Sequence, residues 1–308
     1  KPSMLAVGLA MAGGAWLFAP RGVPGRVGAI ALFIPLLLTP EPRPAEGDWR
    51  ATFLDIGQGT AVVIETARHR LLYDTGPKWS DDADAGQRVV LPHLRAIGAR
   101  RLDAMVVSHA DNDHSGGALA VLDAREVEWL LTSIEHEAPI SRAAKQWRRC
   151  ESGQRWEWDG VRFEVLHPSA ESYAQEAKTN ARSCVLKIAN QHGGLLLTGD
   201  IEAAQERALV DTASPMLRAD VLAVPHHGSL TSSTEGFVDA VAPRIAIVQA
   251  GWFNRFGHPR ADVLARYADR GVDIARTDRD GAIEVRFSAQ GTNMTRLREQ
   301  YARYWHGR

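Results

Sequence analysis

Three apolar segments of this 308-residue chain each end in histidine or aspartate residues, and no other feature limits the possible folds as strongly. The segments are Leu102–His114, which ends in the letters HADNDH, Leu195–Asp200 and Val221–His227. Short apolar runs that stop at turn residues and polar side chains are typical of buried strands. Strand ends that carry ligand-type side chains can converge on one edge of two packed sheets, so the sequence predicts a shared site there.

The rest of the chain alternates short strands with helices. Trp49–Asp55 alternates before a glycine-rich turn, which predicts a strand, and Ala61–Thr66 with Arg70–Asp74 predicts a hairpin. Helices are expected over Val89–Ile97 and Gly116–Leu122. Two sheets with helices on the outside account for this order, so we predict an α+β fold of the αββα sandwich type.

Residues 1–40 contain two stretches of mostly small and apolar residues, Met4–Ala19 and Val27–Leu38. Each stretch is shorter than the roughly 20 residues that span a bilayer comfortably. If both cross, Arg21 and Arg26 in the turn between them would mark the cytoplasmic side, and the following domain would emerge on the extracytoplasmic side. We therefore expect membrane-associated segments, with a signal peptide plus anchor or a buried helical hairpin as the alternatives.

Prolines before and within residues 41–47 oppose helix formation and favour an extended linker, so the folded domain is expected to comprise residues 48–308. Hydrophobic residues make up 45% of the chain, enough for a substantial core, and the net charge of −1 does not support non-specific coating of nucleic acid. Two cysteines are too few for a disulfide framework, and Cys184 is predicted to be a small core residue. The acidic segment Asp81–Asp84 predicts a solvated loop.

The HADNDH segment places four metal-competent side chains within six residues. Imidazole and carboxylate are the ligands expected for Zn²⁺, Mn²⁺ or Fe. The alternative is a polar loop in which Asp113 caps a helix, and Asp200 taken alone could equally cap the helix expected after it. The adjacent His226 and His227 after the third strand are less easily explained in this way. Two cations bridged by a carboxylate and water would activate hydroxide and stabilise a negative transition state.

Eight short stretches together carry a more specific pattern: Leu54–Thr60, Tyr73–Gly76, Val107–Gly117, Val165–Pro168, Asn180–Ser183, Leu197–Asp200, Pro225–Ser229 and Asn254–Pro259. Their order resembles the metallo-β-lactamase superfamily. More closely, it resembles the C-terminal domain of the ComEC family, the DNA-uptake channels of naturally transformable bacteria. The resemblance covers about residues 50–290. The apolar leader and the proline-rich linker also resemble the end of that family's membrane channel region.

The resemblance implies roles for the polar residues at the strand ends. His109 and Asp111 would serve one metal, Asp113 and His114 would serve the other, and Asp200 would bridge the two ions. The superfamily usually has histidine at the position of Asp111 and a further histidine shortly before the strand that ends at Asp200. The ComEC branch shares these departures. The extra oxygen ligands favour Mn²⁺ over Zn²⁺ for the two divalent ions.

The same resemblance assigns the remaining candidate residues. One or both of His226 and His227 would complete the metal site. Asp55 and Asp74 would lie beneath it, although a turn-capping role fits these two carboxylates equally well. The residues expected to carry catalysis are Asp113, Asp200 and His227. The residues expected to contact substrate are Thr60, Asn180, Ser183, Ser229 and His258.

The resemblance implies a metal-dependent deoxyribonuclease that hydrolyses the DNA strand not imported during natural transformation. Its partners would be DNA, the bacterial inner membrane and the DNA-uptake machinery, with a monomeric catalytic domain on the periplasmic side. A metallo-esterase acting on phosphocholine-type or thioester substrates is one alternative, and a non-catalytic DNA-guiding domain is another. The basic and aromatic tail Thr295–Arg308 fits either single-strand binding or a solvated amphipathic helix.

Overall fold

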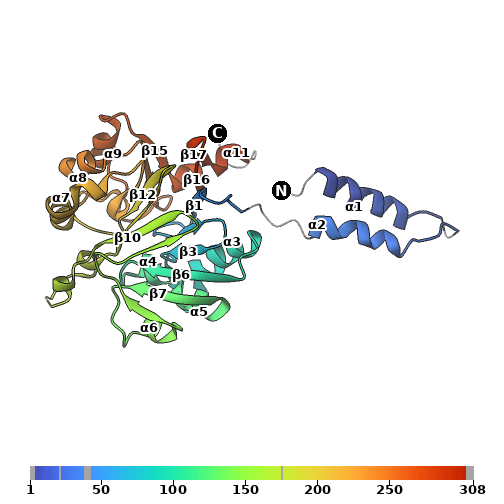
Figure 1. Cartoon of the computed structure of the whole chain (residues 1–308), viewed down its shortest axis with the longest axis horizontal. Coiled ribbons are helices and arrows are strands. Elements are labelled where there is room, and N and C mark those ends of the chain that lie inside the picture. Colours follow the sequence, from blue (N-terminus) through green and yellow to red (C-terminus); the bar gives the residue numbers. More distant parts are fainter. Residues whose placement is uncertain (1–3, 21, 38–42, 175, 303–308) are drawn as a thin grey trace. The chain divides into compact units, whose positions relative to one another are not determined.

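The computed structural model describes residues 4–20, 22–37, 43–174 and 176–302, and Figure 1 shows its helices and strands. The chain divides into two compact units. One unit comprises residues from 1–42 together with residues 96–98, and the other comprises residues 43–95 and 99–308. All the candidate site residues lie in the second unit, so the function is argued from that unit alone.

The first unit contains the helix α1 (Met4–Leu17), the 3-10 helix η1 (Gly28–Phe33) and the short helix α2 (Ile34–Leu37). Gly13 of α1 lies so close to η1 that a Cβ atom there would come within 2.8 Å of the Ala29 carbonyl oxygen. This close approach requires glycine. Among the described residues, no helix has both the length and the apolar character needed to cross a membrane. The membrane association expected for residues 1–40 therefore stays a prediction.

The described strands of the second unit form two large sheets and one short ribbon, and the two large sheets pack face to face (Figure 1). The first sheet has the order β17 (Gly291–Arg296), β16 (Ile283–Ser288), β1 (Trp49–Phe53), β2 (Val62–Glu65), β3 (Arg70–Tyr73), β6 (Arg101–Val107), β7 (Glu126–Thr132), β8 (Trp147–Arg149). The second has the order β15 (Asp273–Arg276), β14 (Ile245–Val248), β13 (Val221–Ala223), β12 (Gly193–Leu197), β11 (Val185–Asn190), β10 (Val161–His167), β9 (Arg155–Trp158). The ribbon pairs β4 (Lys78–Ser80) with β5 (Ala83–Asp84).

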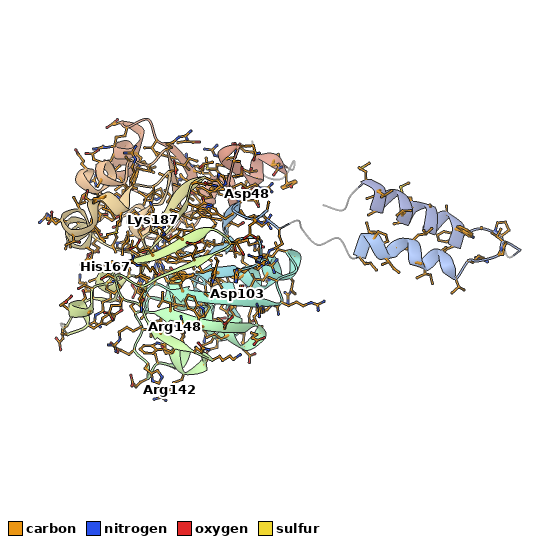
Figure 2. The ribbon with its side chains drawn as sticks, viewed as in Figure 1. Asp48, Asp103, Arg142, Arg148, His167 and Lys187 are labelled. Atoms are coloured by element: carbon orange, nitrogen blue, oxygen red, sulfur yellow. A yellow bond between two sulfur atoms is a disulfide. The ribbon has the colours of Figure 1, made fainter. Side chains whose placement is uncertain are left out.

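The main core lies between the two sheets and takes side chains from both. Trp49 of β1 stacks on Phe287 of β16 with ring centroids 3.7 Å apart, and both rings belong to one buried cluster with Phe163 and Leu195 of the second sheet. Alternate strand residues point inward, which is why the strands read as apolar runs in the sequence. Asp103 of β6, labelled in Figure 2, is buried and accepts a hydrogen bond from the Arg70 backbone nitrogen at 2.8 Å.

Helices cover the outer faces of the sheets. A second apolar cluster joins the second sheet to α7 (Ala203–Leu217), α8 (Glu235–Val241) and α9 (Ala261–Ala268). Near the first sheet lie η2 (Gly86–Val90), α3 (Leu91–Ala96), α5 (Ala118–Ala124) and α6 (Pro139–Ala143) (Figure 1). The remaining short helices are α4 (Asn112–Ser115), η3 (Ala170–Ala174), η4 (Thr179–Arg182), η5 (Pro225–Gly228), α10 (Thr277–Asp280) and α11 (Leu297–Gln300). The predicted αββα layering is confirmed.

The strand directions bring the polar strand ends together. In the first sheet β3, β6, β7 and β8 run parallel, and in the second sheet β12, β13, β14 and β15 run parallel. The carboxyl ends of parallel strands meet at one edge of a sheet. The candidate ligands follow β6, β12 and β13, so the arrangement predicted from the three apolar segments has its structural basis here.

Two details differ from the sequence predictions. Asp81 and Asp82 are exposed as expected, but Asp84 is buried, and its carboxylate accepts a hydrogen bond from the Gln87 backbone nitrogen at 2.8 Å. This carboxylate therefore accepts a hydrogen bond from a free backbone N–H group at the start of η2 instead of facing solvent. Cys184 is fully buried, as predicted, but it forms a disulfide with Cys150 across 34 residues of sequence. No pattern in the sequence predicted this pairing.

Removing the disulfide is expected to lower the free energy of unfolding by about 3–4 kcal/mol, because the bridge restricts the unfolded chain over an intermediate loop length. The measurement is urea unfolding of the oxidised protein against the Cys150→Ala/Cys184→Ala double variant. Dithiothreitol should destabilise only the unmutated protein. Equal stability of the two proteins would show that the bridge makes no net contribution.

Candidate metal centre

The HADNDH segment leaves β6 and folds back on itself through α4. Asp111 keeps an extended backbone with φ −64° and ψ 145°, and the helical turn begins at the next residue. The turn returns His114 beneath His109, so that the centroids of the two imidazole rings lie 4.2 Å apart. Both rings are fully buried. One short loop therefore supplies ligands at two adjacent positions.

Four side chains from the two sheets form a compact cluster. Asp113, His114, Asp200 and His227 each offer a ligand atom, and these atoms all lie within 4.8 Å of one another. His227 Nε2 lies 3.2 Å from Asp113 Oδ2 and 3.2 Å from His114 Nε2. His114 Nε2 lies 3.0 Å from Asp200 Oδ1. The structure thus brings together residues that are far apart in the sequence.

Hydrogen bonds on the far side of each ring orient the imidazoles toward the cluster. The His227 Nδ1 atom lies 2.8 Å from the Gln249 carbonyl oxygen, which can only accept, so Nδ1 carries a proton and donates it. His114 Nδ1 lies 2.7 Å from Asp74 Oδ2. Both arrangements turn the Nε2 atoms toward the cluster, as second partners of metal-ligating histidines do.

Two buried ligand atoms form no hydrogen bond of acceptable geometry with the described residues, although each lies near an oppositely charged group. They are Asp200 Oδ1, 3.0 Å from His114 Nε2, and His109 Nε2, 3.7 Å from Asp111 Oδ2. A buried carboxylate oxygen or imidazole nitrogen without a hydrogen bond is costly, and native structures rarely contain one without an ion or water. Divalent cations accept electron pairs from both atom types, so the residues present fit a metal.

A second group of side chains lies on the other side of Asp200. His109 Nε2 is 3.7 Å from Asp111 Oδ2, and Asp111 is half-buried and accepts a hydrogen bond from the Thr179 hydroxyl at 2.6 Å. His226 Nε2 is 3.7 Å from Asp200 Oδ2. The two oxygens of Asp200 therefore face different histidines: Oδ1 faces the compact cluster and Oδ2 faces His226. This is the arrangement that a bridging carboxylate would need.

The adjacent histidines occupy different environments. Both have left-handed backbone conformations, with φ 49° for His226 and φ 53° for His227. Such angles are uncommon for residues other than glycine and are typical of functional sites. The His227 side chain is 3% exposed and belongs to the compact cluster, whereas the His226 side chain is 21% exposed and its Nδ1 lies 3.2 Å from the Thr231 hydroxyl.

Within the cluster, the carboxylates stabilise the positive charge on the imidazoles, and the imidazoles stabilise the negative charge on the carboxylates. Burial opposes a charge on His114, but the carboxylates of Asp200 and Asp74 outweigh it and raise the pKa of His114 well above its usual range. Burial likewise opposes the charge on Asp200, while His114 and His227 hold the pKa of Asp200 well below its usual range. Metal binding at these imidazoles must therefore displace protons.

Asp74 contacts both Ser108 and His114 and so orients residues of the site. It is fully buried at the end of β3, and its carboxylate accepts hydrogen bonds from the Ser108 backbone nitrogen at 2.6 Å and the Ser108 hydroxyl at 2.8 Å, as well as contacting His114. From the sequence, this position and a turn cap were equally compatible with Asp74. Asp55, the other residue considered with it, instead pairs with Arg298 at 3.0 Å.

Replacing Asp74 with asparagine is expected to weaken divalent metal binding about 10–100-fold, because the anionic partner of His114 is lost. Asparagine tolerates the left-handed backbone at Asp74, where φ is 55°. The matched control is Asp159→Asn, since Asp159 is also buried with φ 51° but contacts Thr66 and Arg68 away from the cluster. Chelator competition with Mn²⁺ and Zn²⁺ measures the affinity. Equal losses in both variants would contradict a specific role for Asp74.

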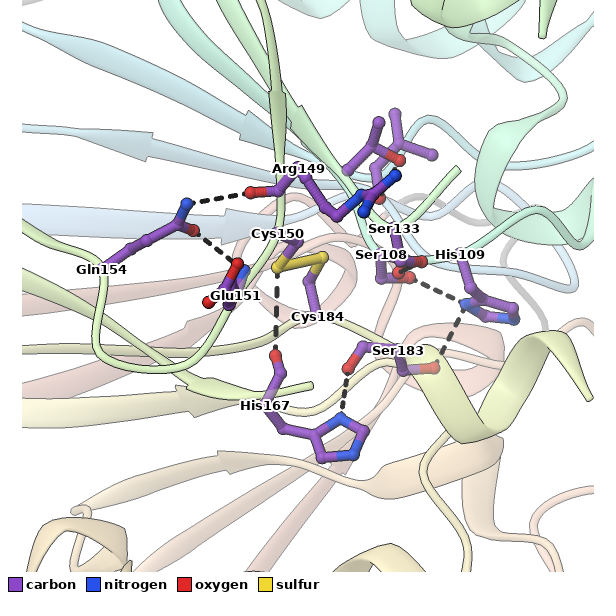
Figure 3. The surroundings of a disulfide bond; sticks show 12 residues. Ser108, His109, Ser133, Arg149, Cys150, Glu151, Gln154, His167, Ser183 and Cys184 are labelled. Carbon is purple, nitrogen blue, oxygen red and sulfur yellow. Dashed lines mark hydrogen bonds between the residues drawn. A yellow bond between two sulfur atoms is a disulfide. The ribbon is translucent and has the colours of Figure 1, made fainter. Parts of the chain in front are cut away.

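Ser183 and Thr60, which were expected to contact substrate, both lie against the ligands. Ser183 is fully buried, and its hydroxyl accepts a hydrogen bond from the Asp200 backbone nitrogen at 3.1 Å and lies 3.3 Å from His109 Nδ1 (Figure 3). The Thr60 backbone nitrogen donates to the Asp113 carbonyl at 3.0 Å. These contacts position ligands, and direct contact with substrate stays a prediction for both residues.

The other three residues expected to contact substrate lie farther from the compact cluster. Ser229 is buried with its hydroxyl 3.1 Å from the Thr231 hydroxyl, and Asn180 is half-buried in η4. The His258 ring centroid lies 5.9 Å from that of His226. Burial and then the nearby histidines His227 and His226 lower the pKa of His258 to about 4. His258 is therefore neutral at physiological pH.

The disulfide lies directly behind this site (Figure 3). Cys184 follows Ser183 in the sequence, and its backbone nitrogen donates to the Ser108 carbonyl oxygen at 3.0 Å. Ser108 and Ser183 both lie within hydrogen-bond distance of His109 Nδ1, at 2.9 Å and 3.3 Å. Because the Ser108 hydroxyl donates to Asp74, it accepts from His109 Nδ1, which leaves His109 Nε2 available to a cation.

Comparison with known proteins agrees with this geometry. Residues 54–252 match the model of the Metallo-beta-lactamase superfamily, and the chain belongs to that superfamily. The fold is similar to that of a metallo hydrolase from the archaeon Ignicoccus hospitalis, with a TM-score of 0.50 and 14% sequence identity over 78% of this chain and 99% of that one. The His/Asp cluster of this chain fits divalent metal binding.

Two curated relatives match most of this chain. The chain is 36% identical to "Competence protein ComA" of Neisseria gonorrhoeae over 298 residues, which cover 96% of this chain and 40% of that protein. It is 32% identical to "ComE operon protein 3" of Bacillus subtilis over 255 residues, which cover 76% of this chain and 32% of that protein. The chain thus spans two fifths or less of the length of these relatives.

Proposed function

We propose that residues 48–308 form the metal-dependent nuclease domain of a DNA-uptake channel of the ComEC type. In this proposal the domain hydrolyses phosphodiester bonds of the strand that is not imported during natural transformation. The observation that carries the proposal is the compact cluster of Asp113, His114, Asp200 and His227, in which Asp200 Oδ1 is buried within 3.6 Å of two histidine nitrogens. The competence relatives supply the choice of DNA as the substrate.

Divalent ions bound between these residues would polarise phosphoryl oxygens and lower the pKa of water. Within the chain, Asp74 and the Gln249 carbonyl orient His114 and His227, while Asp200 presents its two oxygens to the two halves of the site. We propose two ions for this reason. Carboxylate oxygens from three aspartates accompany the imidazoles, so Mn²⁺ is the preferred candidate over Zn²⁺.

We propose further that the domain acts on the extracytoplasmic side of a bacterial inner membrane, as a monomer, next to the DNA-uptake machinery. The disulfide between Cys150 and Cys184 supports the side of the membrane, because such bonds persist in oxidising compartments. The short apolar stretches of residues 1–40 support the membrane attachment. Protease protection of the intact chain in cells and in spheroplasts would test this location.

The test of the function is cleavage of end-labelled single- and double-stranded DNA by the purified chain with Mn²⁺, with Zn²⁺ and with EDTA. We expect cleavage that depends on metal and stops in EDTA. His109→Ala should abolish it, because this variant removes a buried imidazole nitrogen that forms no hydrogen bond and is available to a cation. The matched control is His192→Ala, since His192 precedes β12 at the end opposite Asp200 and should retain full activity.

Failure to cleave DNA by a folded protein with bound metal would reject the nuclease proposal. Hydrolysis of phosphocholine esters or thioesters under the same conditions would then favour the metallo-esterase. Metal-independent DNA binding without hydrolysis would favour the DNA-guiding domain. In each case the Tm of the protein with and without metal shows whether the domain was folded and loaded.

A further inference from the structure

An exposed aromatic loop lies beside the metal centre. It runs from Gly251 to Arg260 between β14 and α9, and within it Trp252 is 67% exposed, Phe253 89% and Phe256 48%. Large aromatic side chains are usually buried, and a group of three in one short loop indicates a contact surface. The metal chemistry described above does not use these rings.

The loop holds a defined shape. The Asn254 side chain donates to the Gly251 carbonyl at 3.0 Å and to the His258 carbonyl at 2.6 Å, and it accepts from the His258 backbone nitrogen at 3.0 Å. Asn254 thereby ties the two ends of the loop together. Phe253 has φ +53°, which is unfavourable for a bulky side chain and is found where the surrounding structure imposes it. The exposed rings therefore lie on a backbone whose conformation is fixed by the hydrogen bonds of Asn254.

The loop connects the metal centre with a neighbouring cleft. At one end, Trp252 lies three residues after Gln249, whose carbonyl orients His227. At the other end, the His258 ring lies 5.9 Å from the His226 ring. Between them, the rings of Trp252 and Phe253 pack edge to face with centroids 5.1 Å apart. The loop thus runs from the strand end that orients His227 to the ring beside His226.

The cleft has a volume of about 410 Å³ and is lined by Trp252 together with mainly polar residues, namely Asp55, Gln58, Asn254, Asp278 and Arg298. It adjoins the metal site through one turn: Gln58 lies two residues before Thr60, whose backbone nitrogen donates to the Asp113 carbonyl. An aromatic wall above polar hydrogen-bonding groups is the lining expected of a pocket for a flat, polar ring.

Charge complementarity favours a nucleic acid as the occupant. The only charged residues between Gly251 and Arg260 are the arginines Arg255 and Arg260, and both are exposed. Both acidic residues of the adjacent cleft are paired with arginines: Asp55 lies 3.0 Å from Arg298, and Asp278 lies 2.7 Å from Arg276. Aromatic rings interleaved with arginines are what single-strand binding proteins use, because every base has a face that can stack.

We propose that Trp252 and Phe253 form a base-stacking subsite for a nucleotide next to the phosphate that lies in the metal centre. This proposal rests on the proposed function, since it assumes a nucleic-acid strand in the site. The subsite recognises the face of a base and not its sequence, so it makes the site selective for single-stranded or frayed DNA. A stacked duplex would offer it no free base.

The test measures oligonucleotide binding by fluorescence anisotropy in EDTA, where no cleavage occurs, with fluorescein-labelled oligothymidylate of about 12 nucleotides. Trp252→Ala and Trp252→Leu are both expected to raise Kd about tenfold, and Trp252→Phe is expected to stay close to the unmutated protein. The leucine variant keeps an apolar side chain and removes the aromatic face, so a loss of affinity in this variant is due to stacking and not to hydrophobic contact alone. Unchanged Tm values verify that the variants are folded.

An abasic oligonucleotide of the same length separates stacking from charge. It should bind the unmutated protein and Trp252→Leu equally, because no base is present to stack. If Trp252→Leu binds oligothymidylate as tightly as the unmutated protein does, the proposal is overturned. A second result would also overturn the proposal: Trp252→Ala binds DNA as tightly as the unmutated protein but no longer binds anionic lipid vesicles. That result would assign the loop to a membrane surface.

The cleavage assay distinguishes this proposal from the proposed function. Metal-dependent cleavage together with unchanged Kd in the Trp252 variants would reject the subsite and leave the nuclease in place. No cleavage with any metal, together with base-dependent binding through Trp252, would reject the nuclease and retain the subsite. Absence of both would reject both.

Discussion

Asp200→Ala is expected to reduce metal-dependent DNA hydrolysis by about a thousandfold or more, because several kcal/mol of transition-state stabilisation depend on ions that this carboxylate would bridge. Asp200 is 4% exposed, and its two oxygens face His114 and His226. Its removal deprives both halves of the site of an anionic ligand. The same variant should bind less metal per chain, and this loss is measurable by atomic emission after gel filtration.

The control for this variant is Asp220→Ala. Asp220 also lies next to a strand of the second sheet, but it accepts a hydrogen bond from the Gly194 backbone nitrogen at the end opposite the cluster. It should lose some stability and keep its metal. Undiminished hydrolysis by folded Asp200→Ala would show that catalysis takes place elsewhere in the chain.

Gly59→Ala is expected to lower the free energy of unfolding by about 3 kcal/mol or more and also to weaken metal binding. Gly59 has φ +129°, and a Cβ atom there would lie 2.2 Å from the Asp113 carbonyl oxygen. That carbonyl accepts the hydrogen bond from Thr60 that fixes the loop carrying Asp113. The clash must therefore move Asp113, one of the candidate metal ligands.

Gly57→Ala separates this clash from backbone strain. Gly57 belongs to the same turn and has φ +78°, but a Cβ atom there would meet nothing within 4 Å. It should lose only about 1 kcal/mol, and its metal affinity should remain unchanged. Urea unfolding and chelator competition measure the two quantities. Similar losses in both variants would mean that strain alone determines the effect.

Much of the fold could be predicted from the sequence because local patterns and tertiary structure agree. The apolar runs before Asp200 and His226 are buried parallel strands, and Trp49–Asp55 contains β1. The HADNDH motif was informative because four metal-competent side chains within six residues favour an ion site over a simple helix cap. The match to the superfamily model over residues 54–252 supports the same conclusion.

The parts that the sequence could not predict depend on long-range geometry. The pairing of Cys150 with Cys184 requires the ends of β8 and β11 to meet across two sheets, and spacing alone does not encode this contact. The different positions of His226 and His227 follow from their backbone angles. The role of Asp74 depends on the parallel pairing of β3 with β6, which brings the Asp74 carboxylate within hydrogen-bond distance of Ser108.

The disulfide has a mechanical consequence for the site. The ligands come from both sheets: Asp113 and His114 follow β6 in the first, while Asp200 follows β12 in the second. The cross-link fastens the two sheets together at that same end, immediately beside Ser183 and His109 (Figure 3). The sheets cannot splay apart there when the ions leave. The protein therefore offers incoming cations a preformed receptor, and little of the binding energy is consumed in closing a gap between two layers.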